Sequence, residues 1–251
     1  MAYLADTHIH SIYSYDGQMR IETVIKRGLE LGLKYLAFTE HVELDQISLK
    51  QFLNRFACYC EEIDSLQEKY SNIKLIKGLE ISNPERHLKE LEIINKLDLD
   101  YILGSNHILP KENDKEEILI YYKRILEIVK NGGIDSLAHL DYVKRKFDDS
   151  FIPDEILEEI FNYLIDANIA LEINTSALRR KGLSSFPSDE KLDLYKKMGG
   201  TLVTIGSDAH RIEEVYDNIE TIDEKFDFNK GLYLKRKFIS LSNDKDGKND
   251  N

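Results

Sequence analysis

The sequence predicts an α/β protein in which about seven parallel strands, each followed by a helix or loop, close into a barrel. Short apolar runs alternate with amphipathic segments, as expected for a parallel sheet covered by helices. Most of the residues able to carry chemistry follow the ends of these apolar runs. The length of 251 residues is common for one α/β barrel, so we expect a single domain.

The alternation of strands and helices can be followed along most of the chain. The predicted strands are Tyr3–Thr7, Tyr35–Thr39, Ile73–Ile81, Tyr101–Ser105, Ser136–Leu140, Ala170–Asn174 and Thr201–Ile205. The predicted helices are Ile21–Leu31, Leu49–Tyr70, Glu85–Lys96, Glu116–Lys130, Asp154–Asp166 and Asp189–Met198. Gly32 and Gly199 directly follow two of these helices and are typical stop signals.

The C-terminal part has a less regular pattern. The residues of Gly231–Ser240 are compatible with either a strand or a helix. Residues 242–251 are polar, and we expect them to form a disordered tail after a barrel domain of residues 1–241.

Composition argues against several classes of protein. The formal net charge is −12, and the chain lacks the large basic block typical of proteins that bind nucleic acid. Its apolar runs are too short to cross a bilayer. The first ten residues lack the features of a secretory signal, which favours a cytoplasmic protein. Cys58 and Cys60 lie two positions apart in a predicted helix and are expected to stay reduced.

The placement of histidines distinguishes a closed barrel from an open sheet. Six of the seven follow the ends of predicted strands: His8, His10, His41, His107, His139 and His210. Glu80 lies near the end of another strand, whereas His87 lies inside a predicted helix and is expected on the surface. In a closed parallel barrel all strand ends open on one face, so these side chains would converge there. An open sheet would spread them along an edge, and we therefore favour the barrel.

Imidazole and carboxylate groups together form a ligand set that suits Zn²⁺, Mn²⁺ or Fe²⁺. Asp16, Glu80 and Asp208 join the six histidines as candidate ligands. Because one ion takes about four protein ligands, this set is enough for two or three divalent ions. The spacing in His8-x-His10 places both rings on one side of an extended backbone, so these two can chelate one ion.

These residues resemble the motifs of the polymerase and histidinol phosphatase (PHP) superfamily. The matching stretches are Asp6-Thr7-His8-Ile9-His10-Ser11, Ser14 with Asp16-Gly17, Thr39-Glu40-His41, Gly78-Leu79-Glu80, Gly104-Ser105 before His107, His139, and Gly206-Ser207-Asp208-Ala209-His210. The stretch Leu171-Glu172-Ile173-Asn174-Thr175-Ser176, followed by Arg179 and Arg180, is similar to the stand-alone histidinol-phosphate phosphatase branch.

The resemblance implies a distorted (β/α)7 TIM-like barrel that holds three metal ions. It gives the first ion these ligands: His8, His10, Glu80 and Asp208. It implies that the second ion shares Glu80 and adds His107 and His139. For the third ion it implies Asp16, His41 and His210, although some relatives have a histidine in place of Asp16.

The resemblance also implies a metal-dependent phosphatase of histidine biosynthesis that converts L-histidinol phosphate to L-histidinol. A hydroxide bridging the ions would attack phosphorus, because metal binding lowers the pKa of water. The residues expected to be catalytic through the ions are His8, His10, Glu80 and Asp208. Arg179 or Arg180 would bind the phosphate group. Five acidic loop residues are candidates to receive the substrate amine: Glu43, Asp45, Glu112, Asp114 and Asp141.

Several alternatives stay open at this point. The same metal site would also suit a phosphoesterase that acts on phosphotyrosine or a nucleotide. An amidohydrolase is disfavoured because it would leave Asp16, His41 and His210 without roles. A non-catalytic, metal-stabilised module is disfavoured because the ligand set is intact. Glu40 either orients a metal ligand or faces solvent.

Overall fold

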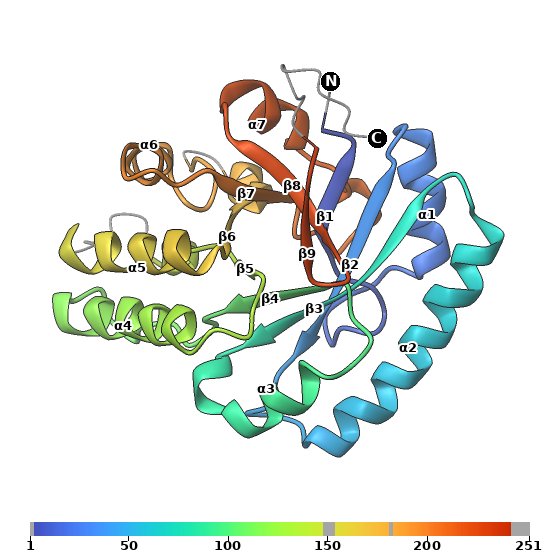
Figure 1. The fold of residues 1–251 in the computed structure, drawn as a ribbon, viewed down its shortest axis with the longest axis horizontal. Coiled ribbons are helices and arrows are strands. Elements are labelled where there is room, and N and C mark those ends of the chain that lie inside the picture. Colours follow the sequence, from blue (N-terminus) through green and yellow to red (C-terminus); the bar gives the residue numbers. More distant parts are fainter. Residues whose placement is uncertain (1–2, 148–153, 181–182, 242–251) are drawn as a thin grey trace.

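A computed structural model describes residues 3–147, 154–180 and 183–241 of the chain (Figure 1). The predicted tail of residues 242–251 lies outside the described residues. The strands are β1 (Ala5–Ile9), β2 (Tyr35–Val42), β3 (Lys74–Ser82), β4 (Tyr101–Ser105), β5 (Ser136–Leu137), β6 (Ala170–Asn174), β7 (Leu202–Gly206), β8 (Asn229–Leu234) and β9 (Lys237–Ser240). The helices are α1 (Ile21–Glu30), α2 (Leu49–Lys69), α3 (Leu88–Ile94), α4 (Lys115–Asn131), α5 (Asp154–Ala167), α6 (Asp189–Lys197) and α7 (Ile219–Lys225).

The strands pair in the order of the sequence, and β1 to β8 run parallel to their neighbours. The sheet closes between β1 and β7, because Ile9 forms a parallel bridge with Ala209 just beyond β7. At this point the His10 amide donates to the Ala209 carbonyl at 2.9 Å. The first seven strands therefore form a TIM-like barrel, as the sequence predicted, and β5 with only two residues makes it irregular.

The last two strands form a hairpin beside the start of β7. β8 pairs with β7 through Asn229 and Lys230. The chain then turns back, and β9 pairs with β8 in an antiparallel manner. The segment that the sequence left open between strand and helix, Gly231–Ser240, is therefore strand on both sides of a turn. The short helix α7 was not predicted.

Two predicted elements differ because the backbone turns sharply next to the barrel mouth. The predicted strand Ser136–Leu140 ends at Leu137, since His139 adopts a φ of +22° that extended backbone does not allow. The predicted helix Glu85–Lys96 begins as a 3-10 turn, η1 (Pro84–Arg86), and continues as α3. His87 lies between these two pieces with non-helical angles, so it is not inside a helix as predicted.

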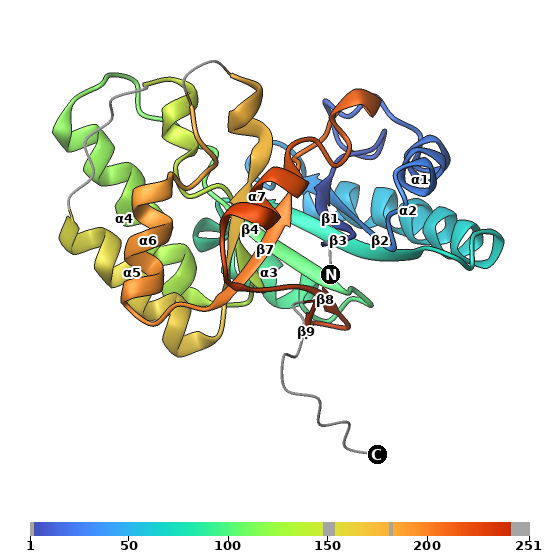
Figure 2. The same cartoon turned by 90° about the horizontal axis from the view of Figure 1, so that it is seen from above.

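The helices cover the barrel from outside, and two of them, α2 and α4, start at side-chain caps. Ser48 and Gln51 form a capping box at the start of α2, and the Asp114 carboxylate accepts two backbone amides at the start of α4. Figures 1 and 2 show the helices arranged around the strands. Apolar side chains of the strands, such as those of Ala37 in β2 and Ile102 in β4, are completely buried.

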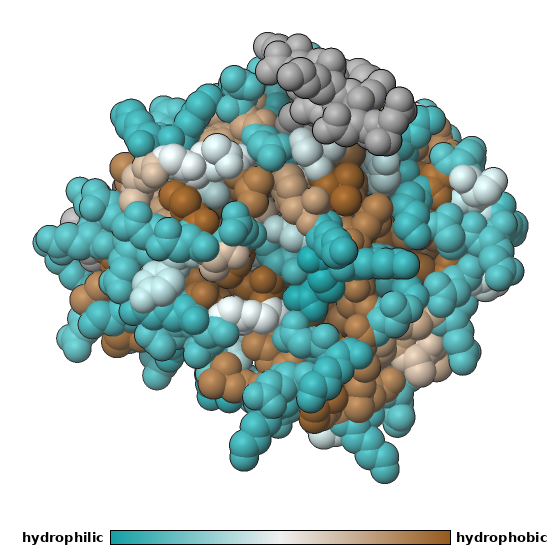
Figure 3. Space-filling view, in the orientation of Figure 1, coloured by the Kyte–Doolittle hydropathy of each residue, from teal (hydrophilic) through white to brown (hydrophobic). Residues whose placement is uncertain are grey.

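The surface in the orientation of Figure 1 is largely hydrophilic, with apolar side chains between the charged ones (Figure 3). Among the described residues, no helix combines the length and the apolar character needed to cross a membrane.

Candidate metal centre

The ends of the barrel strands bring the nine predicted ligand residues to one mouth. Glu80, at the end of β3, lies at their centre and is 1% exposed. Its Oε1 lies 2.7 Å from His139 Nε2 and 3.2 Å from His107 Nε2, while its Oε2 lies 3.0 Å from His41 Nδ1. These three histidines are 27 to 59 positions from Glu80 in the sequence, and His41 lies on the neighbouring strand β2. The convergence comes from barrel closure and not from proximity in sequence.

The first group consists of His8, His10, Glu80 and Asp208. The Nε2 atoms of His8 and His10 lie 2.9 Å apart. Glu80 Oε2 is 3.4 Å and 3.5 Å from these two nitrogens, and Asp208 Oδ1 is 3.8 Å and 3.5 Å from them. Asp208 reaches this position with a φ of +54°, in the left-handed region that Asp tolerates better than most residues.

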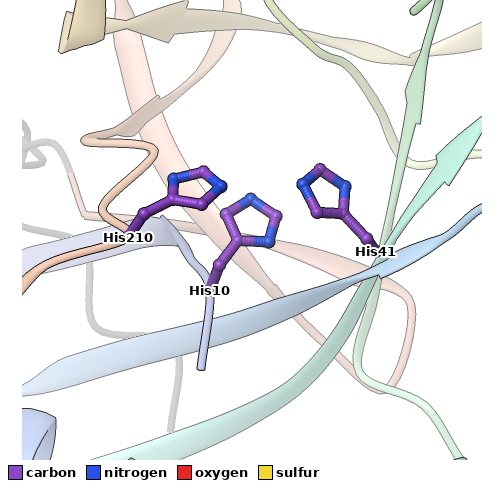
Figure 4. A group of neighbouring side chains, drawn as sticks. All are labelled: His10, His41 and His210. Atoms are coloured by element: carbon purple, nitrogen blue, oxygen red, sulfur yellow. The ribbon is translucent and has the colours of Figure 1, made fainter. Parts of the chain in front are cut away.

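The group predicted to hold the third ion consists of Asp16, His41 and His210. It is more open than the first group, and Asp16 lies between β1 and α1. Asp16 is 39% exposed, and its two oxygens lie 3.4 Å from His41 Nε2 and 3.3 Å from His210 Nε2. Figure 4 shows the His10 ring between those of His41 and His210, with ring centroids 4.1 Å and 4.3 Å away. The possible ligand atoms of these three histidines all lie within 4.8 Å of one another.

The donor atoms fit divalent metal ions. Within the described residues, three sets of ligand atoms are compact enough for a metal ion: His10, His41 and His210; His8, His10 and Glu80; and His41, Glu80 and His107. Among the described residues, the buried Nδ1 atoms of His41 and His139 form no hydrogen bond, although that of His41 faces Glu80 Oε2. A compact mixture of imidazole nitrogens and carboxylate oxygens suits Zn²⁺ or Mn²⁺ better than Mg²⁺.

When no metal is bound, the electrostatics of the mouth favour an ionised Glu80 and a protonated His8 ring. Burial opposes the ionised form of Glu80, but the His107 and His8 rings hold its pKa well below the usual range. Burial likewise opposes a charged His8 ring, but the carboxylates of Glu172 and Glu80 raise its pKa. Burial, together with the neighbouring His41 ring, lowers the pKa of His10. A metal ion would therefore replace a proton held by the His8–His10 pair.

A second layer of buried polar groups holds the outer nitrogens of four histidines. His8 Nδ1 lies 2.5 Å from Glu172 Oε1, and His107 Nδ1 lies 2.9 Å from Glu43 Oε1. His10 Nδ1 lies 3.0 Å from Ser14 Oγ, and His210 Nδ1 lies 3.0 Å from the Asp208 carbonyl. Each of these rings therefore turns its Nε2 toward the mouth, as metal-binding histidines commonly do.

The two carboxylates that hold outer nitrogens, Glu172 and Glu43, were not predicted to orient histidine ligands. Glu172 lies in the stretch that carried the family resemblance, and it also accepts the His139 backbone amide at 2.8 Å. Glu43 was predicted to receive a substrate amine, but it is 7% exposed and also accepts the Ser82 hydroxyl. The signal available in the sequence was their position: Glu43 directly follows the end of β2, and Glu172 lies within β6.

Three other acidic loop residues also have partners within the protein. Asp45 pairs with Arg86 and lies 3.1 Å from His87, and Asp114 caps α4. Asp141 is buried and pairs with Lys191 at 2.6 Å. These carboxylates are therefore not free to receive a substrate amine. Glu112 is exposed.

The two predicted phosphate-binding arginines bind backbone carbonyls. Arg179 donates to the carbonyls of Ser207 and Asp208, and exposed Arg180 donates to the carbonyl of Arg145. Their role toward phosphate stays a prediction.

Arg145 is a basic residue of the mouth that the sequence did not single out. It lies in the 3-10 turn η2 (Tyr142–Arg145), and its Nη2 is 2.8 Å from Asp208 Oδ2 and 2.9 Å from Ser176 Oγ. The sequence showed it only as part of a short basic cluster after His139, and no local pattern indicated that its side chain turns toward Asp208.

Two tyrosine rings flank the histidines. Tyr142 lies with its centroid 4.7 Å from that of His139 and 5.3 Å from that of His107, and the Arg145 guanidinium lies 4.5 Å above its ring. Tyr15 stacks on His41 at 5.0 Å and is 63% exposed. The mouth therefore combines candidate metal ligands with the Arg145 cation and two aromatic faces.

Known proteins are similar to this chain in both sequence and fold. The "Probable histidinol-phosphatase" of Clostridium acetobutylicum is 32% identical over 82% of this chain and 86% of its own length. The protein of the same name from Thermotoga maritima is 32% identical over 90% of this chain and 93% of its own. The crystal structure of histidinol phosphate phosphatase from Lactococcus lactis, complexed with zinc, L-histidinol and phosphate, superimposes with a TM-score of 0.76. It is 25% identical and covers 94% of this chain and 98% of its own.

The family model described as PHP domain matches residues 6–176, which span β1 to the start of the loop after β6. The match includes seven of the nine predicted ligand residues: His8, His10, Asp16, His41, Glu80, His107 and His139. Together with the relatives of 32% identity, this match shows that the chain belongs to the PHP domain family.

Proposed function

We propose that this protein is a cytoplasmic, metal-dependent phosphatase that hydrolyses L-histidinol phosphate to L-histidinol and phosphate. The observation that carries the proposal is the convergence of six histidines, Asp16, Glu80 and Asp208 at one barrel mouth. The substrate is proposed because relatives that cover most of this chain are named histidinol-phosphatases, and a solved neighbour holds L-histidinol and phosphate.

The residues that would hold the ions follow from the three groups of donors. His8, His10, Glu80 and Asp208 would hold one ion, and Glu80 would share a second with His107 and His139. The third would be held by Asp16, His41 and His210. When bound, divalent ions lower the pKa of water toward about 7 and offset the negative charge of a phosphomonoester. Zinc, manganese and iron all suit this donor set.

The surrounding residues would bind the two ends of the substrate. Arg145 would bind the phosphate group, because its guanidinium lies at the mouth and is held in place by Asp208 and Ser176. The exposed ring of Tyr15 offers an aromatic face beside the histidines, on which the imidazole of L-histidinol could stack. Asp208 would thereby link the phosphate-binding arginine to the first group of ligands.

The test is phosphate release from a panel of monoesters by protein supplied with Zn²⁺ or Mn²⁺. The panel contains L-histidinol phosphate, phosphotyrosine, a nucleoside monophosphate and glycerol phosphate. We expect kcat/KM for L-histidinol phosphate to exceed that for every other ester by at least about tenfold, which corresponds to about 1.4 kcal/mol of transition-state discrimination.

A variant separates an enzyme from a metal-stabilised module. His107→Ala removes one candidate ligand and should abolish turnover in a protein that stays folded by circular dichroism. A tenfold preference for another ester would refute the substrate assignment, and metal-independent turnover would refute the proposed metal centre.

A further inference from the structure

We propose that Ser14 is a positioning residue that, together with Glu40, fixes which nitrogen of His10 carries the proton. Ser14 accepts the Nδ1 proton of His10 and donates its own hydroxyl proton to Glu40. His10 must then present an unprotonated Nε2 to the barrel mouth. The inference rests on the proposed role of His10 as a metal ligand.

The geometry places the Ser14 hydroxyl between two partners. Ser14 Oγ lies 3.0 Å from His10 Nδ1 and 2.6 Å from Glu40 Oε2. It also accepts the His41 backbone amide at 3.0 Å. Ser14 is 3% exposed and Glu40 is 4% exposed, so water has little access to this chain of hydrogen bonds.

Counting protons decides the direction of each hydrogen bond. A serine hydroxyl has one proton to donate and two lone pairs that accept. Glu40 also faces the backbone amide of Ser11 at 3.1 Å and the Ser11 hydroxyl at 2.6 Å, so it is surrounded by donors and acts as an acceptor. The Ser14 proton therefore goes to Glu40. The His41 amide can only donate, and the remaining lone pair of Ser14 is left for a proton on His10 Nδ1.

The consequence appears on the opposite side of the His10 ring. Its Nε2 carries a lone pair and no proton, and it lies 2.9 Å from His8 Nε2 and 3.5 Å from both Glu80 and Asp208, within the first group of ligands. A ring with the proton on Nε2 could not ligate a metal ion through that atom. Because Ser14 also holds the His41 backbone, one hydroxyl positions a residue of the first group and a residue of the third.

Ser11 provides a matched control within the same network. Its hydroxyl donates to Glu40 over the same distance of 2.6 Å as that of Ser14. The Ser11 hydroxyl has no hydrogen bond to a histidine among the described residues, and both serines are buried. Ser11→Ala and Ser14→Ala thus remove equivalent bonds to Glu40, but only the second change removes the acceptor of His10.

The first experiment measures zinc binding to the full-length metal-free protein by competition with a chelator, and zinc content by elemental analysis. We expect Ser14→Ala to weaken the affected site about 10- to 100-fold, the usual effect of removing a group that orients a metal ligand. Ser11→Ala should stay within about threefold of the unchanged protein. Equal affinities for Ser14→Ala and Ser11→Ala would overturn the proposal.

His10→Ala separates failure of the positioning role from failure of the proposed metal centre. If His10→Ala lowers the bound zinc and Ser14→Ala does not, the Ser14 role is wrong while the metal centre stands. If His10→Ala leaves zinc content and affinity unchanged, His10 is not a ligand and both proposals are overturned at this residue.

A spectroscopic measurement on the unchanged protein does not depend on whether the Ser14 variant folds. The zinc-loaded protein is labelled with ¹⁵N-histidine, and the ring resonances are assigned with His10→Ala. We expect His10 Nδ1 to show a directly bonded proton and Nε2 to show none. A proton on Nε2 of His10 would overturn the proposal.

Discussion

Both ring nitrogens of His41 face carboxylates, those of Asp16 and Glu80. Burial opposes a positive charge on this ring, but these carboxylates outweigh burial and raise the pKa of His41 to about 9. In the metal-free protein His41 therefore keeps its proton below about pH 9. A metal ligand must be an unprotonated imidazole, so metal binding must displace this proton.

We therefore expect zinc affinity to increase with pH between about 6.5 and 9, by up to about tenfold per pH unit for each displaced proton. Calorimetric titrations at pH 7 in buffers of different ionisation enthalpy count the protons released. The variant His41→Gln should release about one proton fewer than the unchanged protein. Equal proton release would show that His41 is unprotonated before zinc binds.

Arg145 allows a second prediction at the scale of single residues. Arg145→Ala should lower kcat/KM for the phosphomonoester about 10- to 100-fold, because a charged hydrogen bond to phosphate contributes about 1.5–3 kcal/mol. Lys144→Ala is the matched control: it removes a charge from the same turn, and its ammonium lies 3.8 Å from Asp141. Steady-state kinetics with all variants decide the point. A larger loss in Arg179→Ala or Arg180→Ala would assign the phosphate to the loop after β6, as the sequence predicted.

At the scale of elements, the contact between β1 and β7 closes the barrel and also positions the ligands. Buried Asp6 of β1 accepts the amide and the hydroxyl of Ser207 and the amide of Tyr216. One carboxylate thus fastens β1 to the segment that carries Asp208 and His210. Burial raises the pKa of Asp6, and these donors oppose that effect.

Gly206 makes the close approach of these two strands possible. A Cβ atom at this position would lie 2.3 Å from His8 Cβ and 2.8 Å from Glu172 Oε1. Gly206→Ala must therefore displace β1 or β7, and we expect a loss of about 1–3 kcal/mol in the free energy of unfolding together with weaker zinc binding. Denaturant unfolding and zinc titration of the variant measure the two effects.

Gly28→Ala in α1 is the control for this substitution. Its Cβ would meet only side-chain methyl groups of Leu36 and Ile73, the nearest at 2.9 Å, and these can move. We expect little change in zinc affinity and a stability change within about 1 kcal/mol. If Gly206→Ala resembles Gly28→Ala in both measurements, the contact between β1 and β7 is not as tight as the structure indicates.

At the scale of the whole molecule, strand ends from β1 to β7 contribute side chains to one centre, so bound metal should stabilise the entire barrel. Metal removal with a chelator should lower the free energy of unfolding by about 3–4 kcal/mol compared with protein at free zinc 100 to 1,000 times its dissociation constant. Thermal unfolding followed by circular dichroism measures the difference. Added Zn²⁺ should restore the melting temperature, whereas Mg²⁺, which prefers oxygen ligands, should not. An unchanged melting temperature would contradict a centre shared between strands.

Much of this molecule could be predicted because the signals are local. The period of apolar residues predicted seven strands and six helices, with β4 and β6 matching residue for residue. Where the backbone leaves the regular regions, local periodicity failed: the non-helical angles of His87 divided a predicted helix, and the turn at His139 shortened a predicted strand. Left-handed conformations at residues other than glycine depend on tertiary contacts, such as the bond from the His139 amide to Glu172.

The sequence by itself determined the parallel α/β architecture and which imidazoles and carboxylates follow the strand ends, because both depend only on spacing along one segment. The tertiary structure alone decided which groups hold those imidazoles and which cation lies beside them. The bonds from Glu172 to His8 and from Arg145 to Asp208 join residues 164 and 63 positions apart. Such pairs form only after the barrel closes and its register is set, so no local pattern in the chain specifies them.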